Sequence, residues 1–315
     1  MAIRNEIIRL LEQNRQAPLS GQELARQLGV SRSAVWKTVQ ALQKEGYGIA
    51  ATRNGYRLES DSDMLSAEGI RLHLGTVPVG EIRVYAQVDS TNNVAKQAAV
   101  EGVPDRSIIV ADAQTAGRGR QGRDFYSPPG SGLYMSIVLR PHQSLSDSLL
   151  VTVAAAVAVC RAVEELAGLQ PRIKWVNDVF LDNKKFVGIL TEAISDFESG
   201  MVEAIVVGIG VNVRPVDLPP ELRDVVTSLP ARSCTRNALC AAVFKELLWV
   251  REYPRSQLIA AYKERSLLLG RTVCFERDGV AFEAQAVDIN DDGNLVVRND
   301  GTLMTLCSGE VSVRL

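Results

Sequence analysis

The chain has 315 residues, of which 46% are apolar and 23% are charged, a composition typical of globular proteins that excludes a disordered or fibrous chain. Its formal net charge of −2 conceals an asymmetry: residues 1–60 carry nine basic and five acidic side chains, a net of +4, whereas the rest of the chain carries 26 and 32, a net of −6. This small basic region on an acidic body favours a DNA-binding head over a protein that coats nucleic acid along its whole length.

Residues 2–58 show three helical segments. The first carries Ile3, Ile7, Leu10 and Leu11 on one face, at helical spacing. The second segment is predicted over Gly21–Leu28, after a Ser20 N-cap with glutamate three residues later, and Gly29 should end it. Ser31 is suited to cap the third segment, which is predicted to continue to about Gly46 with Val35, Val39 and Leu42 facing its core.

The next segment, GIAATRNGYRL, predicts a β-hairpin with the Asn54-Gly55 turn signal near its tip. Two helices joined by a glycine turn and followed by a hairpin predict a winged helix-turn-helix, whose third helix enters the major groove of DNA. The alternative is a small helical protein-interaction module, against which the basic charge argues. The candidate DNA contacts are Ser31, Arg32, Ser33, Trp36, Lys37 and Gln40 of the third helix and Arg53 and Arg57 of the wing.

Beyond a polar, acidic segment at residues 59–66, which reads as a linker, apolar strands alternate with helical patterns. Hairpin-like pairs such as LDNKKF favour a mixed, largely antiparallel sheet over a doubly wound one. The predicted strands are Ile82–Val88, Ser107–Ala113, Leu133–Leu139, Ile173–Trp175, Val187–Ala193 and Glu203–Val211. The predicted helices are Thr91–Glu101, Leu145–Leu166, Arg236–Arg251 and Arg255–Arg265.

From Gly270 the pattern changes to short strands separated by turns at Arg277–Gly279, Asp291–Gly293 and Asn299–Gly301, which predicts a small SH3-like β-barrel. The predicted fold class is therefore α+β: a winged helix-turn-helix at 1–60, a central α/β domain with a mixed sheet at 61–267, and the barrel at 268–315.

Cysteine and histidine are too few and too scattered to predict a zinc site, because the five cysteines form no Cys-x-x-Cys pair and there are two histidines. The apolar run Val151–Cys160 is too short to cross a bilayer, and the N-terminus lacks the apolar region of a secretion signal. We therefore expect a cytoplasmic protein with reduced thiols and no membrane partner.

The loop GRGRQGR at Gly117–Arg123 combines three arginines with three glycines. Glycine lets the backbone approach a ligand closely, and arginine offers a planar charged group suited to carboxylate and phosphate. Taken alone, the string is also compatible with a solvated basic turn. The motifs around it favour an anion site: DSTNN at Asp89–Asn93, ADAQTA at Ala111–Ala116, KWVND at Lys174–Asp178, KKFVGIL at Lys184–Leu190 and VVGIGVNV at Val206–Val213.

In this order and spacing, the motifs resemble those of the biotin protein ligase family. With the N-terminal helix-turn-helix pattern, nearly the whole chain resembles the bifunctional biotin ligases and biotin operon repressors of bacteria. The resemblance implies ATP-dependent activation of biotin to biotinyl-5′-AMP and transfer to a lysine of the biotin carboxyl carrier protein of acetyl-CoA carboxylase. It also implies biotin-responsive repression through operator DNA, with a homodimer when the adenylate is bound.

The resemblance also assigns the site. Holding a carboxylate and a phosphate about 4 Å apart costs about 4 kcal/mol at an effective dielectric of about 20, so cations must face both. The residues implied for biotin are Ser90, Thr91, Asn92, Gln114, Gly117, Arg118, Arg120, Lys185, Gly188 and Gly208. Those implied for the nucleotide are Arg118, Arg120, Arg123, Phe125, Lys174, Asn177, Asp178 and Asn212. The implied catalytic residues are Arg120, Lys185 and Asp178, and Asp178 is also the candidate for Mg²⁺ bound through the phosphates.

The sequence departs from the family pattern at two positions. Val176 stands where the family often has proline, and Phe125 where it usually has tryptophan. The residue that shields adenine in some relatives is not identifiable, although VVTSL at Val225–Leu229 occupies its region. These departures bear on affinity and not on the reaction.

Each motif also has a purely structural reading. Ser90-Thr91 can cap the next helix, Gly208 and Gly210 can relieve crowding between strands, Lys184-Lys185 can be an exposed pair, and Asp178 can be a turn residue. Two other functions stay open: a repressor that senses biotin without catalysis, and a lipoate or octanoate transferase of related fold. The activation residues argue against the first, and the loop and KWVND strings argue against the second.

Overall fold

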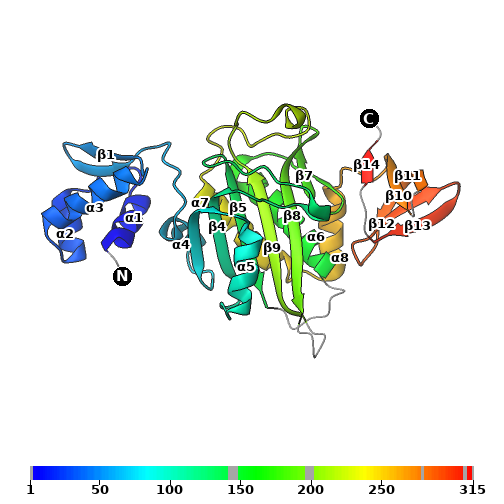
Figure 1. Ribbon diagram of the computed structural model, residues 1–315, viewed down its shortest axis with the longest axis horizontal. Helices are drawn as coiled ribbons and strands as arrows, with labels where there is room; N and C mark the ends of the chain where they lie inside the picture. The colour runs from blue at the N-terminus through cyan, green and yellow to red at the C-terminus, as the bar shows by residue number, and fades with distance from the viewer. Residues whose placement is uncertain (1–2, 141–147, 196–201, 278–279, 308–310, 314–315) are drawn as a thin grey trace. The chain divides into compact units, whose positions relative to one another are not determined.

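The computed structural model describes residues 3–140, 148–195, 202–277, 280–307 and 311–313 (Figure 1). Its contacts divide the chain into two compact units. One contains Met1–Val77 and Cys234–Ala242, and the other contains Pro78–Ser233 and Val243–Leu315. The domain boundaries predicted at residues 60 and 267 were drawn from sequence motifs. The division by contacts does not test them, so they stay a prediction.

The first unit contains the three predicted helices and the hairpin. Its elements are α1 Ile3–Gln13, α2 Gly21–Leu28, α3 Arg32–Lys44, β1 Ile49–Thr52, β2 Gly55–Leu58 and α4 Ala67–Leu74. Ser20 caps α2 by accepting from the backbone N of Glu23 at 3.0 Å, and Ser31 caps α3 by accepting from the N of Ala34 at 3.2 Å. Gly29 ends α2 with a left-handed φ of 65°. The serine and glycine signals from which α2 and α3 were predicted are therefore the residues that bound these helices in the structure.

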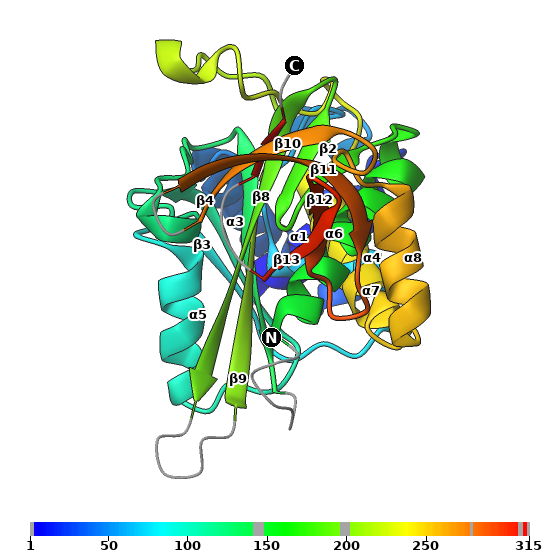
Figure 2. The ribbon, with the colours of Figure 1, turned by 90° about the vertical axis from the view of Figure 1, so that its right-hand side faces the viewer.

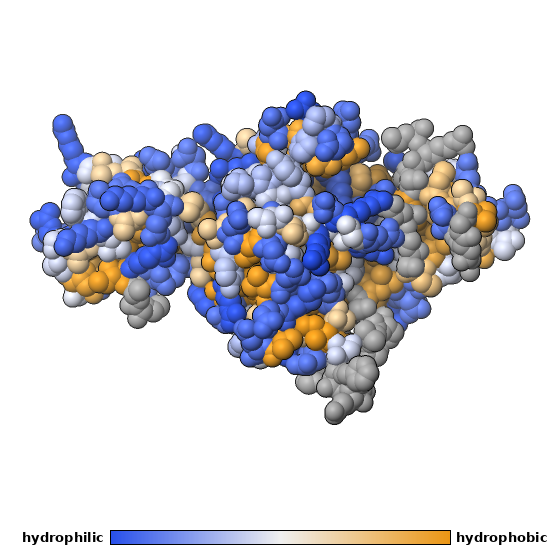
Figure 3. Space-filling model, viewed as in Figure 1, coloured by the Kyte–Doolittle hydropathy of each residue, from blue (hydrophilic) through white to orange (hydrophobic). Residues whose placement is uncertain are grey.

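The core of this unit comes from the apolar faces of the helices. Ile7 of α1, Leu24 of α2 and Val35, Val39 and Leu42 of α3 are all completely buried. The hairpin closes one edge of the cluster through Ile49 and Leu58, which are directly paired. In the space-filling view the visible surface of this unit is mainly hydrophilic (Figure 3).

The segment read as a linker is in part a buried structure. Asp63 and Arg236 are both buried, with Oδ2 and Nε 3.3 Å apart, and the backbone N of Arg236 donates to Asp63 Oδ1 at 2.7 Å. Ser66 then accepts from the backbone N of Gly69 at 3.0 Å and caps α4, a helix that the sequence did not predict. The linker interpretation of residues 59–66 was wrong here, because the partner of Asp63 lies 173 positions away.

Asp63→Ala is expected to lower the free energy of unfolding by about 3 kcal/mol, because it leaves the guanidinium of Arg236 buried without its counter-charge. Urea denaturation measures the change. Glu45→Ala is the matched control, since it breaks the exposed pair with Arg4 and should cost less than about 1 kcal/mol. Equal losses in the two variants would contradict the assignment.

The second unit is built on a seven-stranded sheet of order β3-β4-β5-β9-β8-β7-β6. Only the β3–β4 pair is parallel, so the predicted mixed, largely antiparallel sheet is confirmed. The strands are β3 Ile82–Val88, β4 Ser107–Gln114, β5 Gly132–Leu139, β6 Arg172–Lys174, β7 Asp178–Leu181, β8 Lys184–Ser195 and β9 Val202–Asn212. The sequence missed β7, which has four residues between two functional motifs.

Helices cover both faces of this sheet (Figure 2). Helix α5 (Thr91–Val100) packs its alanines against Ile109 of β4, Val138 of β5 and Val206 of β9. The helices on the other face are α6 Ser148–Ala167 and α8 Arg255–Glu264, and α7 spans Arg236–Val250. The start predicted for α6 at Leu145 lies outside the described residues. In the part of the chain that the structure describes, no helix is long and apolar enough to cross a membrane.

The C-terminal strands form a five-stranded antiparallel sheet of order β13-β12-β11-β10-β14. They are β10 Thr272–Arg277, β11 Val280–Ile289, β12 Leu295–Asn299, β13 Thr302–Leu306 and β14 Val311–Val313. Gly293 and Gly301 have φ values of 82° and 81° in two of the predicted turns. The third predicted turn includes Asp278 and Gly279, which lie outside the described residues. The predicted α+β class with a small all-β C-terminal part is confirmed.

Candidate active site

A small polar cavity opens where α5 begins against the sheet, and we call it the polar pocket. Its volume is about 30 Å³, close to that of one water molecule. Its walls come from five different helices and strands, from the loop Gly117–Arg123, which we call the Gly/Arg loop, and from Phe125, two residues after it. They are Ser90, Thr91, Asn92, Gln114, Arg118, Phe125, Tyr134, Gly188, Leu190, Gly208, Ile209 and Gly210.

The start of α5 supplies hydroxyl and amide groups to this pocket. Ser90 occupies the N-cap position but makes no capping hydrogen bond through its side chain, contrary to the expectation that it also caps the helix. The backbone N of Thr91 instead donates to Oε1 of Gln114 at 2.8 Å. Nε2 of Gln114 donates to Ser127 Oγ at 2.9 Å, which fixes the amide orientation. Ser90 therefore lines the pocket without capping the helix through its side chain.

A second group of polar side chains lies beneath them. Ser136 of β5 donates to Oδ1 of Asn92 at 2.7 Å, and its oxygen lies 2.8 Å from Thr91 Oγ1. Nδ2 of Asn92 donates to Glu192 Oε2 at 2.7 Å, and Glu192 Oε1 accepts from Lys96 at 2.7 Å. The sequence interpretation did not identify Ser136, Glu192 or Lys96, although Ser136 interrupts an otherwise apolar strand.

Glycines on β8 and β9 make room for side chains that form the pocket. A Cβ at Gly208 would lie 2.1 Å from Oδ1 of Asn92, and a Cβ at Gly210 would lie 2.6 Å from the ring of Phe125. Gly188 is paired with Gly210 across the two strands, and its Cβ would meet the same ring at 3.1 Å. The Phe125 ring thus lies on a shelf of two paired glycines, in edge contact with Tyr134.

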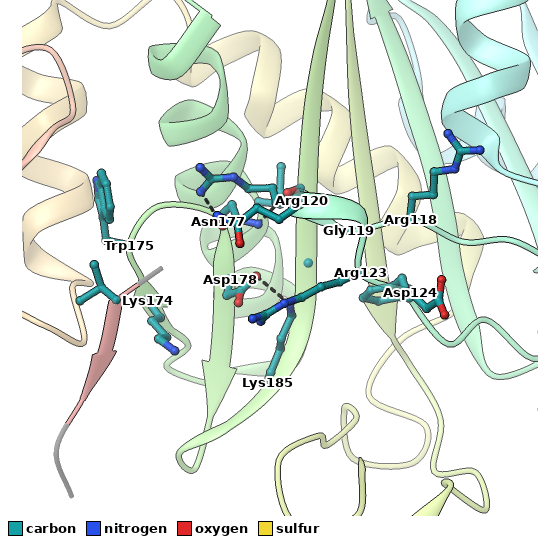
Figure 4. Close-up of a pocket in the computed structure, with 15 residues that line it drawn as sticks. Arg118, Gly119, Arg120, Arg123, Asp124, Lys174, Trp175, Asn177, Asp178 and Lys185 are labelled. Carbon is teal, nitrogen blue, oxygen red and sulfur yellow. Dashed lines mark hydrogen bonds and ion pairs between the residues drawn. The ribbon is translucent and has the colours of Figure 1, made fainter. Parts of the chain in front are cut away.

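A larger cavity of about 120 Å³ adjoins the polar pocket, with Arg118, Phe125 and Gly188 in the walls of both. We call it the cationic cleft. Figure 4 shows that its charged side chains come from the Gly/Arg loop, the KWVND segment and β8. Its walls are Arg118, Gly119, Arg120, Gln121, Arg123, Asp124, Phe125, Lys174, Trp175, Asn177, Asp178, Lys185, Gly188, Ile189 and Val311.

Asp178 and Lys185 face one another in this cleft (Figure 4), with Oδ1 and Nζ 2.7 Å apart. The carboxylate oxygen is buried but receives no well-directed hydrogen bond, so this contact is an ion pair and not a satisfied donor–acceptor pair. Asn177 donates to the carbonyl of Ile189 at 2.9 Å and accepts from Arg120 at 3.3 Å. The cleft therefore contains an anion receptor with an incompletely satisfied carboxylate beside it.

The Gly/Arg loop is folded over the cleft by its own backbone. Gly119 N donates to the carbonyl of Arg123 at 2.7 Å, and Phe125 N donates to that of Gly117 at 2.8 Å. Gln121 adopts a left-handed φ of 57°, consistent with its expected tolerance of a turn. The loop presents the Arg118 and Arg123 side chains at exposed positions, and Arg120 is half-buried against Asn177.

Two buried aromatic side chains, Trp175 within the KWVND segment and Tyr262 of α8, fix the position of the segment before Asp178. Nε1 of Trp175 donates to the carbonyl of Gly293 in the C-terminal sheet at 2.8 Å. The Tyr262 hydroxyl donates to the carbonyl of Val176 at 3.0 Å, and burial raises the pKa of this phenol well above its usual value. Both contacts tie the KWVND segment to parts of the chain more than 80 positions away.

Most of the predicted site residues thus lie around the two cavities. The exceptions are Gly117 and Asn212, which line neither. A Cβ at Gly117 would lie 2.4 Å from the carbonyl oxygen of Phe125, so this glycine shapes the loop. Asn212 donates to the carbonyl of Thr227 at 3.2 Å and fixes the segment after β9.

The candidate DNA contacts of the first unit are all exposed. Ser31, Arg32 and Ser33 at the start of α3 are exposed, as are Lys37 and Gln40 further along it. Trp36 is 53% exposed, a large fraction for an indole in a helix that packs its opposite face into a core. Arg53 and Arg57 of the hairpin are exposed too. Thr52 pairs with Gly55 and the wing turn lies at Arg53-Asn54, so the Asn54-Gly55 signal is near the tip of the hairpin, as predicted.

Three family models match the chain: an HTH domain over residues 3–57, the biotin/lipoate A/B protein ligase family over 84–212, and the biotin protein ligase C-terminal domain over 268–314. The bifunctional ligase/repressor BirA of Bacillus subtilis is 35% identical, with 99% of this chain and 98% of that protein covered. The chain belongs to the biotin protein ligase family. The Escherichia coli protein of the same name is 29% identical over 94% of this chain and 92% of its own length.

Solved structures agree with this placement. A biotin protein ligase from Aquifex aeolicus in complex with biotin and ATP is 28% identical, with a TM-score of 0.63. The likeness covers 74% of this chain and 98% of the Aquifex chain. The Bacillus and Escherichia relatives match more than nine tenths of this chain and are both named bifunctional ligase/repressor, whereas the Aquifex ligase matches about three quarters of it.

Proposed function

We propose that this chain activates biotin with ATP to biotinyl-5′-AMP and transfers the biotinyl group to a lysine of the biotin carboxyl carrier protein of acetyl-CoA carboxylase. The observation that carries the proposal is the junction of the two cavities, which share Arg118, Phe125 and Gly188. Biotin has a polar ring at one end and a carboxylate at the other, so it suits a polar pocket that leads into a cationic cleft. A lipoyl or octanoyl chain has no polar head to match the first cavity.

In this assignment the ureido ring of biotin binds Ser90, Thr91 and Gln114, with Asn92 and the backbone of Gly117 and Arg118 at the edge of the pocket. The valeryl chain crosses Gly188 and Gly208, where a side chain would meet the atoms already packed there. The carboxylate then reaches Lys185 and Arg120 in the cationic cleft.

The nucleotide is assigned to the cationic cleft and its rim. Arg118, Arg120, Arg123 and Lys174 supply positive charge to the phosphates, Asn177 and Asp178 lie at their side, and Phe125 covers an apolar part of the ligand. Asn212 supports the neighbouring segment through Thr227. No Walker A sequence is present, so these side chains take over the phosphate binding of a P-loop.

Asp178 also fits Mg²⁺ bound mainly through the phosphates. Its buried Oδ1 is paired with the Lys185 ammonium at 2.7 Å but receives no well-directed hydrogen bond, and Mg²⁺ commonly binds one or two carboxylates together with phosphate oxygens. In the part of the chain that the structure describes, no three His, Cys, Asp or Glu side chains gather to hold a metal alone. The ion would neutralise phosphate charge, and the protein would supply one ligand.

The side chains then act in two steps. In the first, Lys185 and Arg120 lower the repulsion between the biotin carboxylate and the α-phosphate, so that a carboxylate oxygen can attack phosphorus and pyrophosphate can leave. In the second, the acceptor lysine attacks the carbonyl carbon of the adenylate, AMP leaves, and Asp178 takes the proton from the amine. An amide to the carrier protein results.

The first unit adds repression of biotin genes to the proposal. Bound adenylate keeps the Gly/Arg loop closed and favours a homodimer, whose two winged heads match a two-fold operator. The protein acts in the cytoplasm, where its thiols stay reduced. Analytical ultracentrifugation with and without biotinyl-AMP tests the dimer, and a ligand-independent dimer with undiminished operator affinity would contradict this coupling.

Lys37→Ala is expected to weaken operator binding about tenfold and to reduce the salt dependence by about one phosphate contact. Lys37 is exposed on the face of α3 that turns away from the core. Fluorescence anisotropy at several salt concentrations measures both quantities. Lys44→Ala, at the far end of the same helix, is the control and should bind DNA almost as the parent does.

ATP-dependent transfer of biotin to a purified biotin carboxyl carrier domain tests the enzymatic proposal. The domain is used with its acceptor lysine and with that lysine replaced by arginine. Labelling that depends on the lysine and on ATP is expected. Biotin binding without labelling would replace the proposal by the repressor that senses biotin and does not catalyse.

A further inference from the structure

Glu192 holds an unusual place for a charged residue of the central sheet. It lies on β8 on the same face as α5, and its side chain is 31% exposed. One carboxylate oxygen accepts from Lys96 and the other from Asn92, each at 2.7 Å. No step of the proposed reaction uses Glu192, and it lines no wall of the polar pocket. Glu192 nevertheless contacts Asn92, which does line the polar pocket.

Two acceptors, the Glu192 carboxylate and the carbonyl of Leu190, decide which way the Asn92 amide points. A carboxylate accepts hydrogen bonds and cannot donate, so the NH₂ of Asn92 must face Glu192. The carbonyl of Leu190, 3.1 Å from the same nitrogen, is also an acceptor and requires the same orientation. Oδ1 of Asn92 is therefore directed to Ser136 and to the space that the missing side chain of Gly208 leaves open.

The orientation is passed on to the pocket through hydroxyl protons. The amide oxygen of Asn92 has no proton, so Ser136 must donate, and its hydroxyl is the donor to Asn92 Oδ1 at 2.7 Å and to Thr91 Oγ1 at 2.8 Å. The Thr91 hydroxyl donates to Oε1 of Gln114 at 3.2 Å, an oxygen that also accepts from the Thr91 backbone N. Both hydroxyl protons are thereby engaged within the protein, and a lone pair of Thr91 Oγ1 remains as an acceptor for a ligand.

We infer that Glu192 is a positioning residue that fixes the polarity of the polar pocket through Asn92 and Ser136, so that the pocket selects a ring that presents N–H donors. The inference rests on the proposed function, because it explains how that pocket distinguishes a ureido ring from a ring of the same shape with fewer donors. A buried acceptor left without a donor is costly, so polarity gives stronger selection than shape.

Glu192→Gln tests this with little change in volume. A glutamine has one acceptor oxygen in place of two, so Lys96 and Asn92 must compete for it, and the longer contact with the Leu190 carbonyl is left as the main restraint on the Asn92 amide. The KM for biotin should rise about tenfold, whereas the KM for ATP and kcat should stay within about twofold. Discrimination against a biotin analogue with a ring oxygen in place of one ureido N–H should fall by about tenfold.

Lys96→Met is the matched variant. It breaks the same ion pair and leaves the contact between Glu192 and Asn92 in place. If the pair only fastens α5 to β8, both variants lose similar thermal stability and alter biotin use equally, which would overturn the inference. The expected result is similar thermal stability in both, with the change in biotin KM and in discrimination confined to Glu192→Gln.

Calorimetric binding of free biotin separates this inference from the proposed function. A parent protein that binds biotin, with Glu192→Gln binding biotin and the oxygen analogue in the same ratio, overturns the role of Glu192 alone. A parent protein that does not bind biotin overturns both. A shifted ratio in Glu192→Gln supports the positioning role even if transfer to the carrier domain fails.

Discussion

Lys185→Met should lower kcat/KM for biotin activation by about a thousandfold. The Lys185 amine lies at the centre of the cationic cleft, 2.7 Å from Asp178, where the biotin carboxylate and the α-phosphate are proposed to meet. Methionine keeps the unbranched aliphatic part of the side chain but leaves two anions and the Asp178 carboxylate facing one another. A preorganised charge at such a position commonly contributes a factor of 10²–10³ or more. Biotin-dependent exchange between ATP and pyrophosphate measures the loss.

The adjacent lysine provides the control. Lys184 is on the same strand, but its amine donates to the carbonyl of Arg223 at 2.8 Å and it lines neither cavity. Lys184→Met should leave the exchange rate within about twofold of the parent value. Similar losses in the two variants would mean that the lysine pair stabilises the hairpin, which is the structural reading of the KK motif.

Arg120→Gly is expected to release biotinyl-AMP roughly a hundredfold faster and to label bystander proteins. The Arg120 side chain reaches across the cleft to Oδ1 of Asn177 at 3.3 Å, and this is the contact by which the loop holds the far wall (Figure 4). The substitution removes a contact that closes the loop and a positive charge that faces the adenylate, so water and other amines gain access to the adenylate. Release is measured by rapid filtration of enzyme loaded with labelled biotin.

A second substitution separates charge from reach. Arg120→Lys keeps a cation but has no planar group to bond Asn177 and the adenylate together, so its release rate should lie between those of the parent and the glycine variant. Unchanged release and unchanged target specificity in Arg120→Gly would refute the proposed sequestering role of the loop.

Local signals predicted much of the fold. Serine caps and a glycine stop bounded α2 and α3, and alternating apolar residues located the long strands of the sheet. Helix α4 was missed because its eight residues follow an acidic segment whose burial depends on Arg236. An ion pair between residues 173 positions apart leaves no local pattern.

The residues of the candidate site likewise fall into those that local sequence signals identified and those that depend on contacts between distant positions. Residues on loops and at strand ends belong to recognisable motifs, and Arg120, Asp178 and Lys185 do come together in one cleft. Ser136 and Glu192 lie inside strands, and their partner Asn92 is 44 and 100 positions away. A serine within an apolar run was a visible signal at Ser136. The role of Glu192 depends on strand register and on the direction of an amide, neither of which the sequence alone specifies.

The Phe125 ring has a consequence for inhibitor discovery. Resting on Gly188 and Gly210, it forms part of the partition between the polar pocket and the cationic cleft. A fragment screen should therefore yield two separate classes of hits, small ureas or lactams for one compartment and compact anions for the other. Merging them needs a linker that displaces the ring. A tryptophan at this position would make a bulkier partition, so linker width offers a route to selectivity between proteins that differ here.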